Sequence, residues 1–510
     1  MQKPFSVFDR EQPKTAVVTA SANPLDVVII GAGIAGAAVA RELSRYRLDV
    51  AVVEREAEVC FGATKGTHAI VHCGIPGTAS PLKDRGELAG NRMMEEVCRE
   101  LDVPFKRIGK LVVAFDEGEV ADLQRLEADI SRNGVPGVRL IRDRNVLRRL
   151  EPHLSDRVVA ALHTPTTGIT SPWSLVYGLM ENAVANGCRL YLDAPVRSLT
   201  PTADGRVALL AGSHRMCARC VVNAAGAQAG LIASLAGDRS FTLEFLKMQR
   251  VILDRNFGEM ATHLIRGLDQ GDPLGDFVCP TIDGNLMLGS TVEEVDHEDE
   301  NATTADGIGG WVLPAALRLV PGLPVQGVIR PFSAALPVAG SDYCVAPSPE
   351  LPQLIHFVLG ASGMTASVAM ARYLIEQVLP GAGLELKEKA RFVAQRRDMP
   401  HFRDLDDDAR AALIARDGRF GRMVCRCESV SEGEISEAIR RGARTRDGIK
   451  FRTRAGMGRC QSNFCGPKLL EIMSRELGRP VETLTRRGVD SHELAVSGRP
   501  AKRVARWLKR

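Results

Sequence analysis

The sequence predicts an α/β protein, in which a doubly wound domain carries an inserted mixed-sheet domain and is followed by a small helical module that holds four cysteines. Three observations support this fold class. A βαβ pattern surrounds a glycine turn near residue 31, two later apolar strands run into glycine turns, and four cysteines gather after residue 423. At 510 residues, the chain is long enough for two or three domains.

The two ends of the chain are polar. Residues 1–24 lack apolar periodicity and contain no stretch of signal-peptide length. Residues 486–510 form a basic end in which Val504, Trp507 and Leu508 recur at roughly helical spacing, so this end is either a solvated tail or a weak docking element for a membrane surface or an acidic partner. With no apolar window of about 20 residues, we expect a cytoplasmic protein, at most peripheral to the inner face of the membrane.

The charge of the chain gives no reason to expect a nucleic-acid partner. The formal net charge is only +4. Composition is that of an ordinary globular protein, with 45% apolar and 25% charged residues, so the function must be sought in motifs.

The first predicted element is a βαβ unit that begins at Leu25. A β-branched run leads into Gly31-Ala32-Gly33-Ile34-Ala35-Gly36, which fits the G-x-G-x-x-G pattern, and a helix and a second β-branched run follow, ending at Glu54. The glycines allow a tight turn, close approach of the backbone to a pyrophosphate, and close packing of helix on strand. A carboxylate at Glu54 can accept hydrogen bonds from a ribose. We therefore predict a Rossmann-like dinucleotide site with the phosphates at the helix N-terminus.

Two later strands also end in small-residue turns. One is the run RCVVNAAG over 219–226, and the other is 354–363, which leads into a helix over 366–378. Alternating patterns and helices lie between them, as expected for a mixed-sheet domain built from insertions.

Together these elements resemble the FAD-dependent oxidoreductases of D-amino-acid oxidase type over roughly residues 25–385. Arg55 directly follows Glu54, the strand over 221–226 matches the one beside the flavin nucleotide, and the turn over 360–365 matches the one that meets the isoalloxazine. The resemblance implies bound FAD within an oxidoreductase domain over 25–397. The FAD-binding part would be about 25–95, 165–235 and 335–385, and the rest mainly the substrate domain.

Residues 60–75, CFGATKGTHAIVHCGI, resemble the flavin-lining region of L-2-hydroxyglutarate and glycerol-3-phosphate dehydrogenases. This resemblance implies that His72 faces the substrate as a general base, with His68 a weaker candidate. Arg330 resembles an arginine near the substrate pocket, where a guanidinium can hold a carboxylate or phosphate, and a surface arginine is the alternative. The cofactor-binding residues implied by both resemblances are Gly31, Ala32, Gly33, Ile34, Ala35, Gly36, Glu54, Arg55, Thr64, Lys65, Thr67, Val196, Ala225, Gly226, Gly360, Gly363, Met364 and Thr365.

The resemblance further implies a dehydrogenase that oxidises a small anionic alcohol, either glycerol 3-phosphate or a 2-hydroxy acid, by hydride transfer to FAD. An amine or amino acid remains open as the substrate, because the wider family also oxidises C–N bonds. Cys73 stands where the relatives often have Ser or Ala, which leaves the substrate undecided.

Four cysteines form the last motif. Cys425 and Cys427 are followed, after 32 residues, by Cys460 and Cys465. Four thiolates at such spacing can ligate either a 2Fe-2S cluster or a tetrahedral zinc ion. We expect a linker over 398–422, then a module over 423–485 with one helical segment, Glu432 to Arg441, between the pairs. Cys217 and Cys220 also spell C-x-x-C, but no second pair lies near them, so we interpret this spacing as coincidence.

The segments MVCRCESVSEGEISEAIRRGA and TRAGMGRCQSNFCGPKLL resemble the bacterioferritin-associated-ferredoxin-like domain that follows the flavin domain in some glycerol-3-phosphate dehydrogenase subunits. The resemblance implies a 2Fe-2S cluster through which electrons leave the flavin for a one-electron acceptor protein or a quinone-linked partner subunit. The alternative is an electron-transfer subunit whose own flavin site is catalytically idle.

Overall fold

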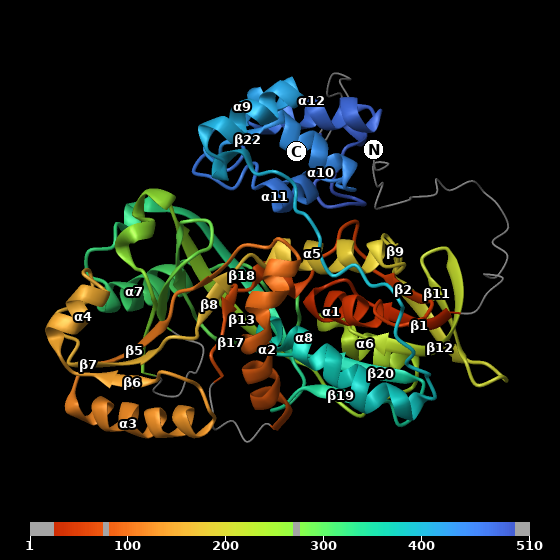
Figure 1. Ribbon diagram of the computed structural model, residues 1–510, viewed down its shortest axis with the longest axis horizontal. Helices are drawn as coiled ribbons and strands as arrows, with labels where there is room; N and C mark the ends of the chain where they lie inside the picture. Colours follow the sequence, from red (N-terminus) through yellow and green to blue (C-terminus); the bar gives the residue numbers. More distant parts are fainter. Residues whose placement is uncertain (1–24, 75–80, 269–275, 495–510) are drawn as a thin grey trace, which may run out of the picture. The chain divides into compact units, whose positions relative to one another are not determined.

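The computed structural model describes residues 25–74, 81–268 and 276–494, which form two compact units. Among these residues the large unit comprises 25–55 and 59–398, and the small unit comprises 56–58 and 399–494. Figure 1 shows both with colours that follow the sequence. The polar tail expected over 1–24 and the basic end from residue 495 onward lie outside the described residues.

The first sheet of the large unit has a parallel centre. It contains β1 (Leu25–Ile30), β2 (Val50–Val53), β9 (Arg189–Tyr191), β12 (His214–Asn223) and β20 (Leu354–Val358). The hairpin of β10 (Val196–Pro201) and β11 (Val207–Ala211) extends from β12, and β19 (Cys344–Pro347) pairs with β20. All residues of β2 and β20 are buried, as expected for parallel strands covered on both faces. The predicted Rossmann-like βαβ unit is confirmed.

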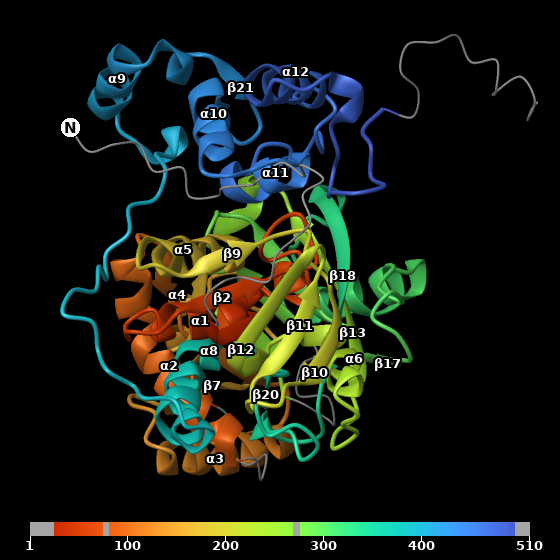
Figure 2. The ribbon, with the colours of Figure 1, turned by 90° about the vertical axis from the view of Figure 1, so that its right-hand side faces the viewer.

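Helices cover this sheet on the side of the glycine turn. Helix α1 (Ile34–Leu43) packs against α5 (Pro172–Ala185) and α8 (Gly363–Tyr373), and α8 packs in turn against α2 (Pro81–Glu100). Figure 2 shows the strands of this sheet beside α6 (Ala229–Leu235) and the β10–β11 hairpin. The helix expected over 366–378 begins earlier, at Gly363, and its last turn, Leu374–Val378, widens to a π-helix.

The second sheet of the large unit is mixed, as predicted. Its strand order is β17-β13-β16-β15-β14-β5-β7-β6, with β18 on the other side of β13, and only β5 and β14 run parallel. The strands are β5 (Lys110–Ala114), β6 (Arg139–Ile141), β7 (Ala160–Thr164), β13 (Glu244–Leu253), β14 (Leu264–Gly267), β15 (Phe277–Pro280), β16 (Leu286–Gly289), β17 (Glu293–Val295) and β18 (Val328–Val338).

One face of the second sheet packs on α7 (Leu313–Leu319) through a core that includes Leu111, Val251 and Leu288. Helices α3 (Glu117–Arg132) and α4 (Arg144–Leu150) lie at the same end of the unit (Figure 1). A small third sheet, of β3 (Ile70–Val71), β8 (Gly168–Thr170) and β4 (Phe105–Arg107), holds the segment that contains the two candidate histidines.

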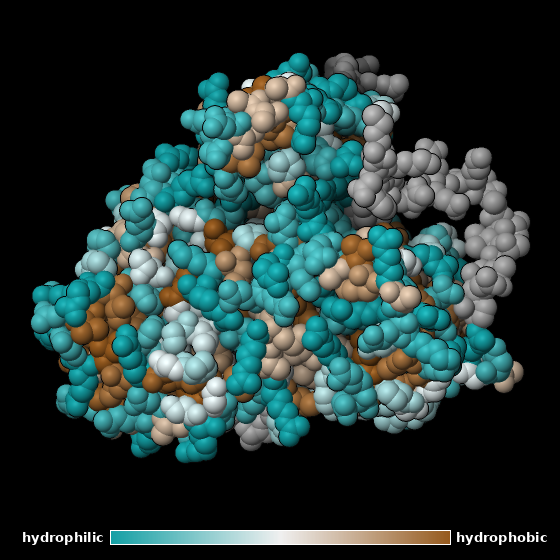
Figure 3. Space-filling view, in the orientation of Figure 1, coloured by the Kyte–Doolittle hydropathy of each residue, from teal (hydrophilic) through white to brown (hydrophobic). Residues whose placement is uncertain are grey.

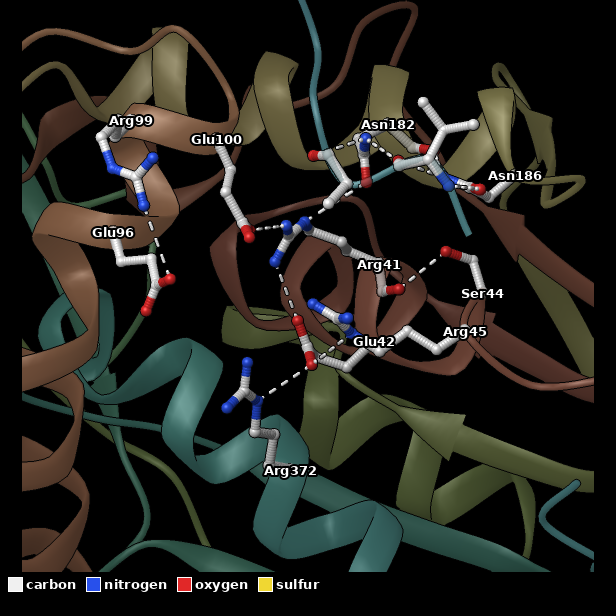
Figure 4. Close-up of polar contacts among 12 residues, drawn as sticks. Arg41, Glu42, Ser44, Arg45, Glu96, Arg99, Glu100, Asn182, Asn186 and Arg372 are labelled. Atoms are coloured by element: carbon white, nitrogen blue, oxygen red, sulfur yellow. Dashed lines mark hydrogen bonds and ion pairs between the residues drawn. The ribbon is translucent and has the colours of Figure 1, made fainter. Parts of the chain in front are cut away.

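A buried network of ion pairs and hydrogen bonds joins helices α1, α2, α5 and α8 near the C-terminal end of α1 (Figure 4). Arg41 of α1 is fully buried and pairs with Glu42 at 3.0 Å and with Glu100 at the end of α2, and its Nε donates to Asn182 of α5 at 3.3 Å. Glu42 also accepts from Arg372 of α8 at 3.0 Å. The Arg41 guanidinium therefore joins α1 to α2 and α5, and Glu42 extends the network to α8.

The small unit is helical, with α9 (Asp407–Arg416), α10 (Glu432–Arg440), α11 (Arg446–Thr453) and α12 (Gly466–Leu477), and with a short hairpin of β21 (Met423–Cys425) and β22 (Val430–Ser431). Ser431 caps α10 in a capping box with Glu434, as its S-x-x-E sequence dictates. The helix expected between the cysteine pairs is present. Helix α11 follows it and was not predicted, because Ile449 and Phe451 are its only large apolar residues and the hydrophobic period is weak.

Two expected boundaries of the small unit differ from the structure. The stretch 398–422, expected as a linker, contains α9, and Met399 already belongs to the core of the small unit. The basic end expected from residue 486 begins later, because Thr485 and His492 form a β-bridge and Glu493 pairs with Arg446 at 2.6 Å. In both places charged residues cover a small core, and a run of charged residues is also typical of a loop.

The face shown in Figure 3 is mainly hydrophilic, with apolar side chains exposed in patches between charged ones. Folded globular domains ordinarily expose apolar atoms in this way. No helix among the described residues is long and apolar enough to span a bilayer.

Candidate active site

The predicted dinucleotide turn has the geometry that its glycines require. Gly31 has a φ of +103°, and a Cβ there would lie 2.5 Å from the carbonyl oxygen of Ala224. A Cβ on Gly36 would lie 1.9 Å from the carbonyl oxygen of Gly31, so only glycine lets α1 approach the turn this closely. Gly33 is the N-cap of α1 and offers no capping side chain. These residues fit the pyrophosphate of a dinucleotide at the helix N-terminus.

The two residues after β2 differ in their surroundings. Glu54 is buried, and its Oε2 accepts a hydrogen bond from the amide of Ala32 at 2.6 Å. The carboxylate is therefore fixed at the glycine turn, where the sequence predicted it. Arg55 is exposed and pairs with Glu298 at 3.3 Å.

Further predicted cofactor residues lie at or just beyond the ends of strands of the same sheet. Ala225 and Val196 both pack against the core cluster of the first sheet. Gly226 has a φ of +56°, and an added Cβ would meet nothing within 4 Å. At the third turn, Ser362 has a φ of +64° and α8 begins at Gly363, whose amide donates to the carbonyl of Gly360 at 3.0 Å.

Thr64 and Lys65 lie in a 3-10 turn, Ala63–Gly66, and Thr67 is its C-cap; all three residues are half-buried. Thr64 Oγ1 accepts from the amide of Ile34 at 3.2 Å, which brings this turn to the N-terminus of α1. A Cβ on Gly66 would lie 2.5 Å from Cβ of Ala334 on β18, so the segment lies between the glycine turn and the second sheet.

The backbone of His72 is held from two sides. Its amide donates to Thr365 Oγ1 at 3.0 Å, and its carbonyl accepts from Asn91 Nδ2 at 2.7 Å. Thr365 and its neighbour Met364 are buried in the first turn of α8. Asn91 in turn accepts from Arg107 at 2.9 Å. The structure thus brings His72 together with the predicted turn over 360–365.

His68 and His72 form a pair whose proton positions follow from one backbone contact. The amide of Ile70 donates to Nδ1 of His68 at 3.1 Å, so the proton of neutral His68 lies on Nε2. That atom is 3.4 Å from Nε2 of His72, which is left as the acceptor. The lone pair of His72 is therefore on Nε2, the atom that would accept a proton.

The surroundings keep His72 neutral. Burial, and after it the basic side chains of Lys110, Arg266 and Lys83, lower its pKa to about 3. The pKa of His68 is also lowered well below its usual value, first by burial and then by basic groups. Positive charge thus dominates around both rings, as suits an anionic ligand. Arg330 lies on β18 opposite Ile252 and is exposed. Its position is compatible both with a residue of the substrate pocket and with a surface arginine.

The four cysteines of the small unit lie in two pairs. The Cys425 thiol contacts that of Cys465, and the Cys427 thiol contacts that of Cys460. The amide of Gly456 donates to Sγ of Cys425 at 3.5 Å, and a Cβ on Gly458 would lie 2.2 Å from Cβ of Cys427, so both glycines let the backbone lie close to a cysteine.

The chemistry of this donor set fits a binuclear cluster. Two pairs of thiolates suit two irons. Cys465 is the N-cap of α12, and hydrogen bonds from the Cys425 thiol and from Ser462 lower its pKa to about 7, which favours the thiolate.

Residues 26–377 match the family model described as FAD dependent oxidoreductase. The chain belongs to this family. Residues 423–475 match a second model, the BFD-like 2Fe-2S binding domain. The chain is thus an FAD-dependent oxidoreductase with a C-terminal 2Fe-2S domain, as the sequence predicted, and its cofactors are FAD and that cluster.

Named relatives extend the likeness over both domains of this FAD-dependent oxidoreductase. A glycerol 3-phosphate dehydrogenase of Caloramator mitchellensis is 36% identical over 457 residues, which cover 89% of this chain and 94% of the relative. One component of the anaerobic glycerol-3-phosphate dehydrogenase of Escherichia coli is 25% identical over 90% of this chain and 89% of its own length. The chain is therefore similar to glycerol-3-phosphate dehydrogenases.

Solved structures show the same fold. The dithionite-reduced L-alpha-glycerophosphate oxidase from Mycoplasma pneumoniae, with FAD bound, superimposes with a TM-score of 0.69 at 22% identity, and covers 74% of this chain and 99% of its own. Glycine oxidase from Geobacillus kaustophilus gives a TM-score of 0.62 at 21% identity. At these identities the likeness concerns the fold.

Sequence reasoning missed the basic side chains that face the histidines. Lys110 and Arg250 stand next to or inside apolar strand runs, KLVVA and MQRVIL, and that setting is the signal that could have marked them. A cation in a buried strand is rare unless a partner compensates its charge.

Proposed function

We propose that this chain oxidises glycerol 3-phosphate at its secondary alcohol to the ketone, dihydroxyacetone phosphate. The observation that carries the proposal is the position of His72, a neutral imidazole fixed beside the flavin-lining segment and surrounded by basic side chains. A neutral base can take the hydroxyl proton, and positive surroundings attract an anionic alcohol. The named relatives of C. mitchellensis and E. coli support this substrate over the 2-hydroxy acids.

In this proposal, separate groups of residues bind the nucleotide, accept the proton and hold the cluster. FAD, when bound, supplies the two-electron acceptor for the oxidation, and the 2Fe-2S cluster supplies a one-electron exit. Nε2 of His72 takes the hydroxyl proton, and Thr365 and Asn91 hold the His72 backbone in place. The turn over 31–36 and Glu54 hold the nucleotide, and Cys425, Cys427, Cys460 and Cys465 hold the cluster.

A partner that accepts single electrons belongs to this proposal. A cluster domain is of no use to an enzyme that passes electrons directly to oxygen, and the E. coli relative is named as one subunit of an anaerobic enzyme. We therefore infer an acceptor protein or a quinone-linked partner subunit.

An anaerobic reduction series tests the substrate. Purified holoenzyme is titrated with glycerol 3-phosphate, 2-hydroxyglutarate, lactate and amino acids while flavin absorbance is followed. We expect bleaching by glycerol 3-phosphate at the lowest concentration. Bleaching by 2-hydroxyglutarate alone, or by amino acids alone, would reject glycerol 3-phosphate as the substrate, and no bleaching by any of them would favour an electron-transfer subunit.

A further inference from the structure

A row of cross-strand neighbours on the second sheet joins two basic residues. The register pairs Arg266 with Phe277, Phe277 with Gly289, and Gly289 with Arg250. Residues directly opposite each other on neighbouring strands place their side chains on the same face. Arg266 and Arg250 therefore share one face of the sheet, with only a phenylalanine and a glycine between them.

Lys110 lies on that same face, one strand further along. It pairs with Leu264, two residues before Arg266, and Val112 pairs with Arg266 itself. Because side chains alternate along a strand, Lys110, Val112 and Arg266 all project from one side. Lys110 is 3% exposed, and no carboxylate pairs with it in the part of the chain that the structure describes.

Three contacts show that this face is turned toward the histidines. The Phe277 ring stands edge-on to the His68 ring, with centroids 6.3 Å apart. Arg250 Nη1 donates to the carbonyl of Gly66, in the flavin-lining segment, at 3.1 Å. Val112 packs in one core cluster with Cys73, the neighbour of His72.

Among the described residues, Arg250 contacts no carboxylate that would compensate its positive charge. This side chain is 2% exposed, its contacts are the Gly66 carbonyl and the sulfur of Met248, and its Nε has no acceptor among the described residues. Burial alone lowers its pKa to about 10. Buried charges are strongly destabilising unless a counterion offsets them, so two such cations on one face indicate a site for an anion.

We propose that Lys110 and Arg250 bind the phosphate group of the substrate. A phosphate presents enough oxygens for an ammonium and a guanidinium together. Glycine at position 289 leaves room for the guanidinium, because a Cβ there would lie 3.2 Å from Cγ of Arg250. Arg330, exposed on the same face, remains a candidate for contact with the same anion. This assignment rests on the proposed function, since it takes the substrate to be a phosphate ester.

The test uses holoenzyme variants Lys110→Met and Arg250→Met, with inorganic phosphate as the probe. Lys106→Met is the matched control, because Lys106 is exposed on β4. Calorimetric titration should show a phosphate Kd raised about tenfold or more in each variant and unchanged in the control. Without phosphate the two variants should melt at a higher temperature than the parent, because each loses an uncompensated buried charge, and added phosphate should no longer stabilise them.

Other outcomes separate this site from the proposed function. A lower melting temperature of Lys110→Met with an unchanged phosphate Kd, or no phosphate binding by the parent, would overturn the site. Loss of FAD from Arg250→Met with phosphate binding intact would assign Arg250 to the flavin and overturn its part here. If phosphate binding depends on Lys110 but glycerol 3-phosphate does not bleach the flavin, the site stands and the proposed function fails.

Discussion

At the scale of single residues, the chemistry depends on His72. If Nε2 of His72 takes the hydroxyl proton, His72→Ala should slow flavin reduction by glycerol 3-phosphate by about two to four orders of magnitude, the usual contribution of a general base. FAD content should stay at the parent level, because the His72 side chain has no part in the glycine turn. Stopped-flow reduction under anaerobic conditions measures the rate. His153→Ala is the control, since His153 is exposed. A variant as fast as the parent would remove His72 from its role.

The lowered pKa of His72 also predicts how stability depends on pH. The unfolded chain binds a proton on this residue below about pH 6.5, whereas the folded chain does so only near pH 3, so folding loses stability as the pH falls between these values. From pH 7 to pH 5 this residue should cost the ligand-free protein about 2 kcal/mol. In His72→Gln the fall in unfolding free energy between pH 7 and pH 5 should be smaller by about that amount. Denaturant titrations at the two pH values give both numbers, and equal falls would show that another group is responsible.

At the scale of helices and strands, the Arg41 network should contribute to the free energy of unfolding by joining α1, α2, α5 and α8. Arg41→Ala should lower the free energy of unfolding by about 3–5 kcal/mol, because it removes a fully buried guanidinium that pairs with both Glu42 and Glu100. Arg99→Ala is the matched control: its pair with Glu96 is exposed (Figure 4), so the change should be within about 1 kcal/mol. Thermal or denaturant unfolding measures both. Similar losses in the two variants would mean that the network contributes no more than a surface pair.

The strands and turns that the sequence predicted best are those with a local physical cause. The turn at Gly31 and Gly36 follows from steric contacts within one βαβ unit, and the start of α12 follows from Gly466 and Pro467. Helix α11 and the boundary at Met399 were missed, because their positions depend on packing against residues far away in the sequence. Local patterns predict an element well only where its cause is also local.

At the scale of the whole molecule, the same distinction explains which parts of the site could be predicted. His72 was predicted from the segment around it, as were the four cysteines. The tie from Thr365 to His72, 293 residues apart, and the cross-strand row from Arg266 to Arg250 exist only once the sheets are assembled. The register of a mixed sheet with long connections cannot be predicted from alternation alone, so the sequence did not predict that Lys110, Arg250 and Arg266 share one face.

The division of the chain into two units predicts how the two cofactors can be separated by mutation. Cys425→Ser should lose or weaken the cluster, whereas the parent should contain about two irons and two sulfides per chain. Because the predicted FAD-binding residues all lie in the large unit, the variant should still bleach with substrate in a single turnover. Its re-oxidation by a one-electron acceptor should slow, since the one-electron exit is missing. Cys217→Ser is the control, because Cys217 and Cys220 lie three residues apart on β12 and so project from opposite faces.

The measurements are iron and sulfide analysis, rapid-reaction absorbance, and low-temperature EPR after anaerobic reduction. The parent and Cys217→Ser should show the rhombic signal of a reduced cluster, and Cys425→Ser should show none. Re-oxidation of Cys425→Ser at the parent rate would exclude the cluster from the electron route even if the iron is lost. One zinc and no iron in protein purified anaerobically from iron-replete cells would make the small unit structural, because zinc carries no electrons.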